Sequence, residues 1–168
     1  SIMSNAPRQG IAFYSVRGCP VVHCMADNRH SWLACTDSLP DMPRLCRALS
    51  PHWNRLRLET PRLVAGDYTT SGLSMRNQIV SYAGKRICLL SDNRWRNKNS
   101  SHPLSVDYLY VSKGYQGGIE ELTSLFSMGM VLDASLSDYY QNKIANDCVR
   151  LGIPYLLLSQ KGSYRILL

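Results

Sequence analysis

Residues 106–135 read VDYLYVSKGYQGGIEELTSLFSMGMVLDAS, and this stretch decides the fold. A β-branched and aromatic run opens it at 106–111, and a second apolar run closes it at 128–132. Between the two runs, apolar residues recur at helical spacing: Ile119, Leu122 and Phe126. The pattern therefore predicts a strand, a helix and a second strand that lies parallel to the first.

The residues that follow these two strands mark the first place to look for a site. Parallel strands bring their carboxyl ends to one edge of a sheet, and open α/β sheets place ligands beyond that edge. The residues at this edge are Ser112, Lys113, Gly114, Asp133 and Ser135.

Upstream of this unit the chain predicts mostly β-structure. A loose lead-in over residues 1–9 precedes three short apolar runs at 11–16, 21–26 and 31–35, which turn-forming residues separate. The pattern predicts a three-stranded antiparallel meander.

A helix is predicted next, followed by a strand and a hairpin. Helical spacing covers 38–49, with Ser38 or Asp41 as the cap and Pro51 as the stop. The alternating run 56–64 predicts an edge strand. Ile79–Tyr82 and residues 87–90 predict a hairpin around the Gly84-Lys85 turn, and a polar loop at 92–99 follows it.

The last part of the chain predicts a helix and two strands. Residues 138–151 are amphipathic, with Asp138 as the cap and Gly152 as the end. Apolar runs at 154–158 and 163–167 predict the closing strands. The sequence thus predicts an α/β (α+β) domain over 10–168, with a mixed sheet in which the meander precedes a βαβαββ arrangement.

The composition is that of a globular chain with a net positive charge. The 168 residues carry 19 Lys and Arg against 12 Asp and Glu, which gives a net charge of +7 and a pI near 9.2, and 45% of the residues are hydrophobic. The composition is not that of a disordered chain. The positive charge points to an anionic partner such as nucleic acid or an acidic membrane surface, but many soluble domains are merely basic, and charge alone does not favour nucleic acid over that alternative. No apolar run reaches the ~20 residues of a membrane span, so we expect a soluble piece cut from a longer protein.

The cysteines predict neither a zinc knuckle nor a redox motif, because no pair has Cys-x-x-Cys spacing. They read as small buried hydrophobes. A bridge between Cys19 and Cys24 in an oxidising compartment stays open, although one strand that holds both would keep them too far apart.

The strongest candidate for binding nucleic acid is the loop Arg94-Trp95-Arg96-Asn97-Lys98. It pairs three cations with an indole, as a surface that neutralises phosphates and stacks a base would. The alternative is a solvated loop whose Trp95 folds back on the core. A second basic face is possible, although exposed arginines of an ordinary helix explain it as well, from Arg44, Arg47, Arg55, Arg57 and Arg62.

Three further candidates have plainer alternatives. The turn at Ser112, Lys113 and Gly114 could offer amides to a phosphate, or it could be an ordinary strand-to-helix turn. Asp133 with Ser135 could hold a cation. His23 is expected to be a core histidine rather than a ligand.

Several strings, in chain order, resemble the metallo-β-lactamase-like domain at the carboxyl end of ComEC-type competence proteins, which are multi-spanning membrane channels of DNA uptake. They are IAFYSVRGC at 11–19, WLACTD at 32–37, RICLLSD at 86–92 and VDYLYVS at 106–112. The likeness spans nearly the whole chain and is greatest to the shortened, Bacteroides-group variant, on the strings CPVVHC, DNRWRN, KGY and LDASLSD. The resemblance implies a degenerate or half metallo-β-lactamase-like fold.

The resemblance also implies two metal ions, but the ligand motif His-x-His-x-Asp-His is absent and Ser112-Lys113-Gly114 stands where the family has His-His-Gly. Only Asp92 matches a ligand of the family. We therefore expect no metal, no cofactor and no catalytic residue, with a vestigial site at Asp92, Ser112, Gly114, Asp133 and Ser135.

The functional prediction is a non-catalytic, soluble domain of a membrane protein that assists DNA uptake. It would bind single-stranded DNA or the transmembrane channel of its own parent protein, with DNA contacts from Arg94, Trp95, Arg96, Lys98 and Lys113. Two alternatives remain. One is a reduced hydrolase, nuclease-like or a phosphodiesterase, that uses Asp92 with one metal, and the other is a purely structural interaction domain. The side of the membrane and the oligomeric state are left open.

Overall fold

The computed structural model describes residues 9–26, 29–36, 39–134 and 136–168. Its elements in chain order are β1 (Gly10–Phe13), β2 (Val21–Met25), β3 (Ser31–Cys35), α1 (Met42–Arg55), β4 (Arg62–Ala65), β5 (Tyr68–Thr69), β6 (Leu73–Arg76), β7 (Ile79–Tyr82), β8 (Lys85–Leu90), β9 (Leu104–Val111), the 3₁₀ turn η2 (Glu120–Leu122), β10 (Phe126–Asp133), α2 (Asp138–Leu151), β11 (Tyr155–Leu157), α3 (Leu158–Lys161) and β12 (Tyr164–Leu167).

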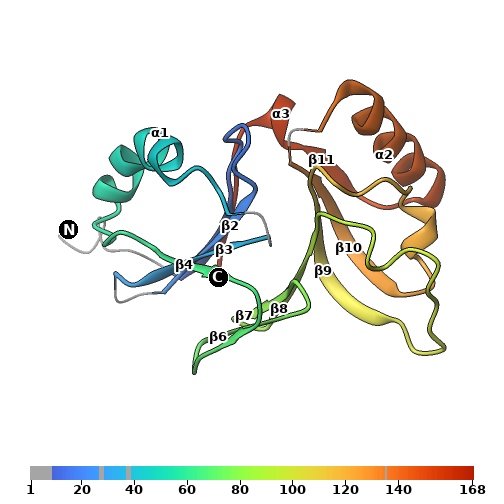
Figure 1. The fold of residues 1–168 in the computed structure, drawn as a ribbon, viewed down its shortest axis with the longest axis horizontal. Coiled ribbons are helices and arrows are strands. Elements are labelled where there is room, and N and C mark those ends of the chain that lie inside the picture. The colour runs from blue at the N-terminus through green and yellow to red at the C-terminus, as the bar shows by residue number, and fades with distance from the viewer. Residues whose placement is uncertain (1–8, 27–28, 37–38, 135) are drawn as a thin grey trace.

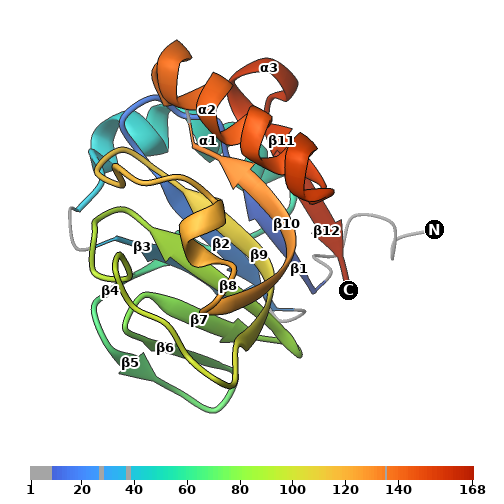
Figure 2. The same cartoon turned by 90° about the vertical axis from the view of Figure 1, so that its right-hand side faces the viewer.

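The described strands form two mixed sheets that face one another (Figure 1). The first sheet has the order β12-β1-β2-β3-β4, and the second has the order β11-β10-β9-β8-β7-β6-β5. Helix α1 covers the outer face of the first sheet and α2 covers the outer face of the second, so the layers run helix, sheet, sheet, helix. Figure 2 shows the second sheet from the side that α2 covers.

Inner strands such as β1 and β2 are buried on both faces, and side-chain alternation along β1 shows how. Ile11 and Phe13 point into the core between the sheets, while Ala12 and Tyr14 point toward α1. The outer face of the second sheet packs its own cluster against α2, with Ile144 as a buried member. Because both faces are covered, these strands read in the sequence as nearly continuous apolar runs.

The regular local predictions are confirmed. Strands β1, β2 and β3 form the antiparallel meander, and β7 with β8 forms the hairpin. Strands β9 and β10 are parallel neighbours, as predicted for the stretch that decides the fold. The mixed α+β class is confirmed, although the strands divide into two sheets instead of one.

The helix predicted between β9 and β10 is wrong. Only the single turn η2 forms there, and Phe126 begins β10. The backbone N–H of Ile119 donates to the carboxylate of Asp147 on α2 at 2.7 Å, and the Tyr115 hydroxyl donates to the carbonyl of Gly118 at 2.7 Å. Since these tertiary contacts satisfy the backbone and Phe126 is needed in the sheet, too few residues remain for an α-helix.

Helix α1 starts and stops later than predicted. Asp41 is the cap, because its carboxylate accepts the N–H of Arg44 at 3.1 Å, while Ser38 lies outside the described residues. Pro51 does not stop the helix, which continues to Arg55. The continuation past Pro51 buries Trp53, which is 3% exposed and packs into the core beneath the helix. The missing N–H costs one hydrogen bond on the exposed side.

The strand predicted over 56–64 is wrong in its first part, because residues 56–61 form the turn and loop that follow α1. Only Arg62–Ala65 pairs, parallel to β3. The short strands β5 and β6 were not predicted. Helix α2 has the predicted bounds and ends at Gly152 in the left-handed conformation, but Ser137 occupies the N-cap instead of Asp138. The two closing strands lie in different sheets, and β12 pairs with β1.

Candidate functional site

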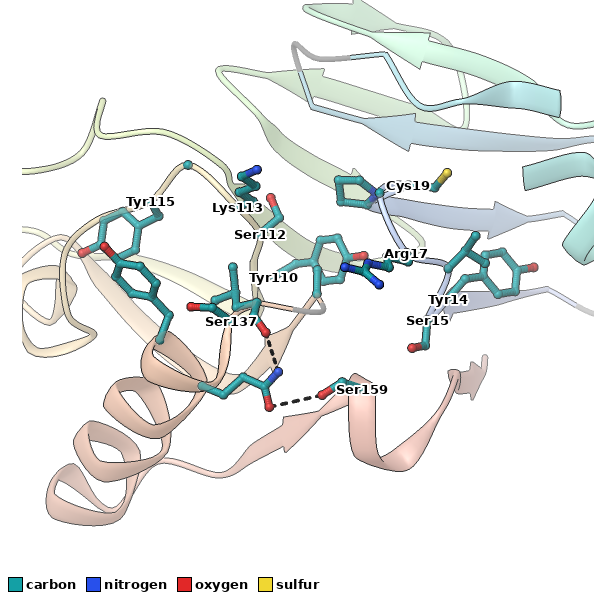
Figure 3. A pocket seen from close by; sticks show the side chains of 18 of the residues that line it. Tyr14, Ser15, Arg17, Cys19, Tyr110, Ser112, Lys113, Tyr115, Ser137 and Ser159 are labelled. Carbon is teal, nitrogen blue, oxygen red and sulfur yellow. Dashed lines mark hydrogen bonds between the residues drawn. The ribbon is translucent and has the colours of Figure 1, made fainter. Parts of the chain in front are cut away.

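A pocket of about 880 Å³ lies where the loops after β1, β9 and β10 meet (Figure 3). The loop after β1 contributes residues from Tyr14 to Pro20, and the loop after β9 contributes those from Ser112 to Gln116. The start of α2 and Ser159 of α3 complete the wall. The pocket therefore occupies the sheet edge at which the sequence predicted a site.

The pocket is positively charged. Arg17 and Lys113 are its only charged side chains among the described residues, and no carboxylate lines it. Both side chains are exposed, and neither makes an ion pair with any residue that the structure describes. Figure 3 shows that Arg17 comes from the β1 side and Lys113 from the end of β9. Four serine side chains also line the pocket, those of Ser15, Ser112, Ser137 and Ser159.

Hydrogen bonds fix the wall on the α2 side. The amide group of Gln141 donates to the carbonyl of Leu136 at 2.5 Å and accepts from the hydroxyl of Ser159 at 3.2 Å. These two bonds, drawn as dashed lines in Figure 3, tie the start of α2 to α3. Tyr110 forms the floor, and complete burial raises the pKa of its hydroxyl above the ordinary range.

Tyr14 joins the pocket to the core beneath α1. Its hydroxyl lies 2.6 Å from Nδ1 of His23 and accepts the indole N–H of Trp53 at 3.3 Å. Burial raises the pKa of Tyr14 to about 12, against the opposing effect of the Trp53 hydrogen bond, and burial lowers the pKa of His23 to about 3. His23 is therefore a neutral, fully buried core residue that shares a hydrogen bond with the Tyr14 hydroxyl at Nδ1.

Gly114 is required at the pocket rim by its backbone. Its φ is +118°, and a Cβ there would lie 2.0 Å from the carbonyl oxygen of Ser91. Ser112 precedes it, and the Ser112 N–H donates to the carbonyl of Leu90 at 2.8 Å. The turn after β9 is thus held against the end of β8, which places Lys113 at the pocket mouth.

The loop 92–99 is not extended, because bends and turns cover residues 92–97. The guanidinium of Arg94 donates to the carboxylate of Asp92 at 2.9 to 3.1 Å and to the side chain of Asn77 at 2.8 Å. Arg96 donates to the carboxylate of Glu121 at 3.0 and 3.2 Å. Internal carboxylates thus offset both charges. Lys98 is exposed.

Trp95 folds back toward the core, as the alternative interpretation had it. Its ring meets the ring of Phe126 edge-on at 5.4 Å and packs against the cluster beneath α2. Since the indole already has an aromatic partner inside the protein, a base would have to displace that contact in order to stack on it.

Neither of the predicted aspartates, Asp92 and Asp133, lines the pocket. Partial burial raises the pKa of Asp92, but the hydrogen bonds from Arg94 outweigh it and hold that pKa below its usual value. Asp133 is fully buried, and its carboxylate accepts the N–H of Leu136 at 3.1 Å; burial raises its pKa. Ser135 lies outside the described residues. The structure therefore brings together Ser112, Lys113 and Gly114, but not the two aspartates.

The donor set does not fit the dinuclear metal centre that the resemblance implies. The pocket lining contains neither an imidazole nor a carboxylate, and Cys19 is its only thiol. Across the described ranges, no group of three or more His, Cys, Asp and Glu side chains is close enough to share an ion. Hydrolytic zinc needs at least three such ligands.

Arg17 is the site residue that the sequence analysis missed. It stands in a Gly-Cys-Pro turn, which predicts a plain strand connection. The string at 11–19, which includes Arg17, is one of those that carry the resemblance, and it could have drawn attention to this residue.

One comparison with known proteins gives a match, and it is to a protein family. A protein-family model described as ComEC C-terminal domain matches residues 11–168. No curated protein and no solved structure matches the chain significantly. Within the described residues, no helix has the length and apolar character needed to cross a membrane.

Proposed function

The chain belongs to the ComEC C-terminal domain family, and from this premise we propose that it is a non-catalytic domain that binds single-stranded DNA during uptake. Membership relates the protein to competence and DNA uptake. The observation that carries the finer proposal is the pocket, in which Arg17 and Lys113 face a ligand space without any carboxylate.

The chemistry of the pocket suits a sugar-phosphate backbone. Two cations neutralise phosphate charge, and hydroxyl groups such as those of Ser15 and Ser137 donate hydrogen bonds to phosphate or sugar oxygens. Tyr14, Tyr115 and Tyr140 also line the pocket, and Tyr140 is the partly exposed one of the three, while the other two are buried. Its ring could stack on a base, and such stacking has little sequence preference. The volume of about 880 Å³ lies within the range of pockets that hold small organic ligands, so a nucleotide unit fits.

The same pocket supports a role without catalysis. Hydrolysis of a phosphodiester needs an activated water, and a metal or a general base commonly supplies it. The lining offers neither an imidazole nor a carboxylate for either purpose. The carboxylate of Asp92, the one residue that matches the family's ligand pattern, is occupied by Arg94.

The parent protein's membrane channel is the second partner in this proposal. A strand held at the pocket would be presented to the channel, and the exposed Lys98 next to the offset Arg94 and Arg96 would add weak, screened attraction. We place the DNA contact at Arg17 and Lys113 and give the loop 92–99 an auxiliary part.

Fluorescence titration of a labelled poly-dT oligonucleotide at several salt concentrations tests the proposal. Wild type should bind, and the double variant Arg17→Gln/Lys113→Gln should flatten the slope of log affinity against log salt by about 1.4, which is ~0.7 per lost phosphate contact. Arg76→Gln/Arg86→Gln is the charge-matched control, because both arginines are exposed on strands of the second sheet away from the pocket. Equal loss in both double variants would assign the binding to net charge alone and reject the pocket.

A further inference from the structure

We propose that the exposed face of α1 extends the pocket into a track for a single-stranded polynucleotide, formed by Arg44, Arg47 and Arg55, here called the α1 stripe. This inference rests on the proposed function and adds a second, separate binding surface to it.

The α1 stripe is a row of like charges on one side of the helix. Leu45, Leu49 and Trp53 bury the opposite side. With 3.6 residues per turn, Arg44, Arg47 and Arg55 fall within one sector of the solvent side, and all three are exposed. Helix α1 contains no acidic residue, and the nearest described carboxylate in sequence, that of Asp41, caps its first turn.

The dimensions of the α1 stripe suit an extended strand. Eleven residues separate Arg44 from Arg55, which corresponds to about 16 Å along the helix. Several nucleotides of an extended strand cover that distance, and single-strand binding folds contact from about 4 to about 16 nucleotides. Three arginines at this spacing can therefore follow successive phosphates of one strand.

The stripe is continuous with the pocket. Arg44 Nη1 donates to the backbone carbonyl of Arg17 at 3.2 Å, so the first arginine of the stripe lies against the pocket rim. At the other end, partial burial lowers the pKa of His52 on α1, and the nearby charges of Arg165 on β12 and of Arg55 lower it further. The positive potential thus runs from Lys113 across the pocket and along the helix.

The exposed face favours nucleic acid over a lipid bilayer. The other exposed residues of α1 beside the arginines are Pro43, Ala48, Pro51 and Asn54, which offer no large apolar side chain for insertion among acyl chains. A concave pocket at the end of the stripe accepts a flexible strand, whereas a bilayer surface is too flat to enter it. Leu39, 67% exposed just before the helix, is the one large apolar side chain near the stripe's start, and a vesicle measurement addresses it.

The length of the bound strand separates the two surfaces. We would titrate the 168-residue chain with poly-dT of about 4 and about 16 nucleotides, since the shorter strand can fill the pocket but cannot span pocket and stripe together. The variant Arg47→Gln/Arg55→Gln should weaken binding of the longer strand by more than about tenfold near 0.1 M salt and leave the shorter strand unaffected. Arg44 is kept because it also contacts the loop after β1.

The controls distinguish the failure of each idea. Arg17→Gln/Lys113→Gln should weaken both lengths, and Arg76→Gln/Arg86→Gln should weaken neither beyond a general charge effect. Binding of both lengths with no response to Arg47→Gln/Arg55→Gln would overturn the track and leave the proposed function standing. If neither oligonucleotide length binds, both the track and the proposed function are overturned. If Arg47→Gln/Arg55→Gln loses binding to vesicles rich in phosphatidylserine while its affinity for oligonucleotides is unchanged, the track is overturned and the α1 stripe binds a membrane surface instead.

Discussion

The hydroxyl of Tyr14 lies 2.6 Å from Nδ1 of His23, and both residues are buried between the first sheet and α1. Trp53 of α1 donates its indole N–H to the same hydroxyl. This hydrogen bond therefore connects α1, which carries the α1 stripe, to Tyr14, which lines the pocket. A buried network of this kind favours one arrangement of its parts.

Stability should depend on pH through His23. Burial lowers its pKa from 6.5 to about 3, so the neutral form is the one the fold stabilises. This contribution is complete above about pH 6.5 and is lost as the pH falls toward 3, at up to about 1.4 kcal/mol per pH unit. Urea unfolding of wild type and His23→Gln between pH 7 and pH 4 should give a shallower pH dependence for the variant. The exposed His102→Gln should behave as wild type, and identical slopes for all three would contradict the burial of His23.

Trp95→Ala should lower stability more than it lowers DNA affinity. The ring packs edge-on against Phe126 over the cluster beneath α2, so its removal should cost about 1 to 3 kcal/mol of the free energy of unfolding. Thermal unfolding and oligonucleotide titration of the same preparation check this. A large loss of affinity with unchanged stability would mean that the indole stacks on a base instead.

Gly114→Ala should destabilise the turn after β9. The added Cβ would meet the carbonyl oxygen of Ser91 at 2.0 Å, and a φ of +118° is unfavourable for any L-residue. We expect a loss of more than about 2 kcal/mol in chemical denaturation. Gly84→Ala is a useful comparison, since it has a positive φ of 77° but nothing within 4 Å of the added atom. An equal loss at both glycines would indicate that the close approach to Ser91 has no effect.

Ile144→Ala should destabilise the protein by about 2 to 5 kcal/mol, because its side chain is 2% exposed in the cluster between α2 and the second sheet. Asn146→Ala on the same helix is exposed and should change stability by less than about 0.5 kcal/mol. Similar values at both positions would show that the helix is rotated relative to the sheet.

Features that depend on local pattern could be predicted from the sequence. The meander, the β7–β8 hairpin and α2 have periodicity and turn residues that act over a few positions. The segment from Ile119 to Phe126 misled because a three-residue spacing between apolar positions also fits a 3₁₀ turn that leads into a strand. Pro51 misled because burial of Trp53, a tertiary effect, outweighs the lost hydrogen bond.

Features that depend on distant segments could not be predicted. The last strand, β12, does not join the second sheet with β11 but pairs with β1 in the first sheet, near the other end of the described chain. The pocket edge was predicted from β9 and β10, but its partner loop at Arg17 comes from β1, about a hundred residues earlier. The carboxylates that offset Arg94 and Arg96 differ in this respect, because Asp92 is close in sequence whereas Glu121 is brought in by the fold.

The central claim is that single-stranded DNA binds at the pocket, and mapping of amide chemical shifts tests it most directly. Titration of the ¹⁵N-labelled chain with short poly-dT at low salt should shift the resonances of Ser15, Arg17, Ser112, Lys113 and Gly114 together and saturably. With longer poly-dT, the shifts should spread to the α1 stripe. Shifts confined to 92–99, or no shifts at all at oligonucleotide concentrations in excess of the protein, would contradict the account.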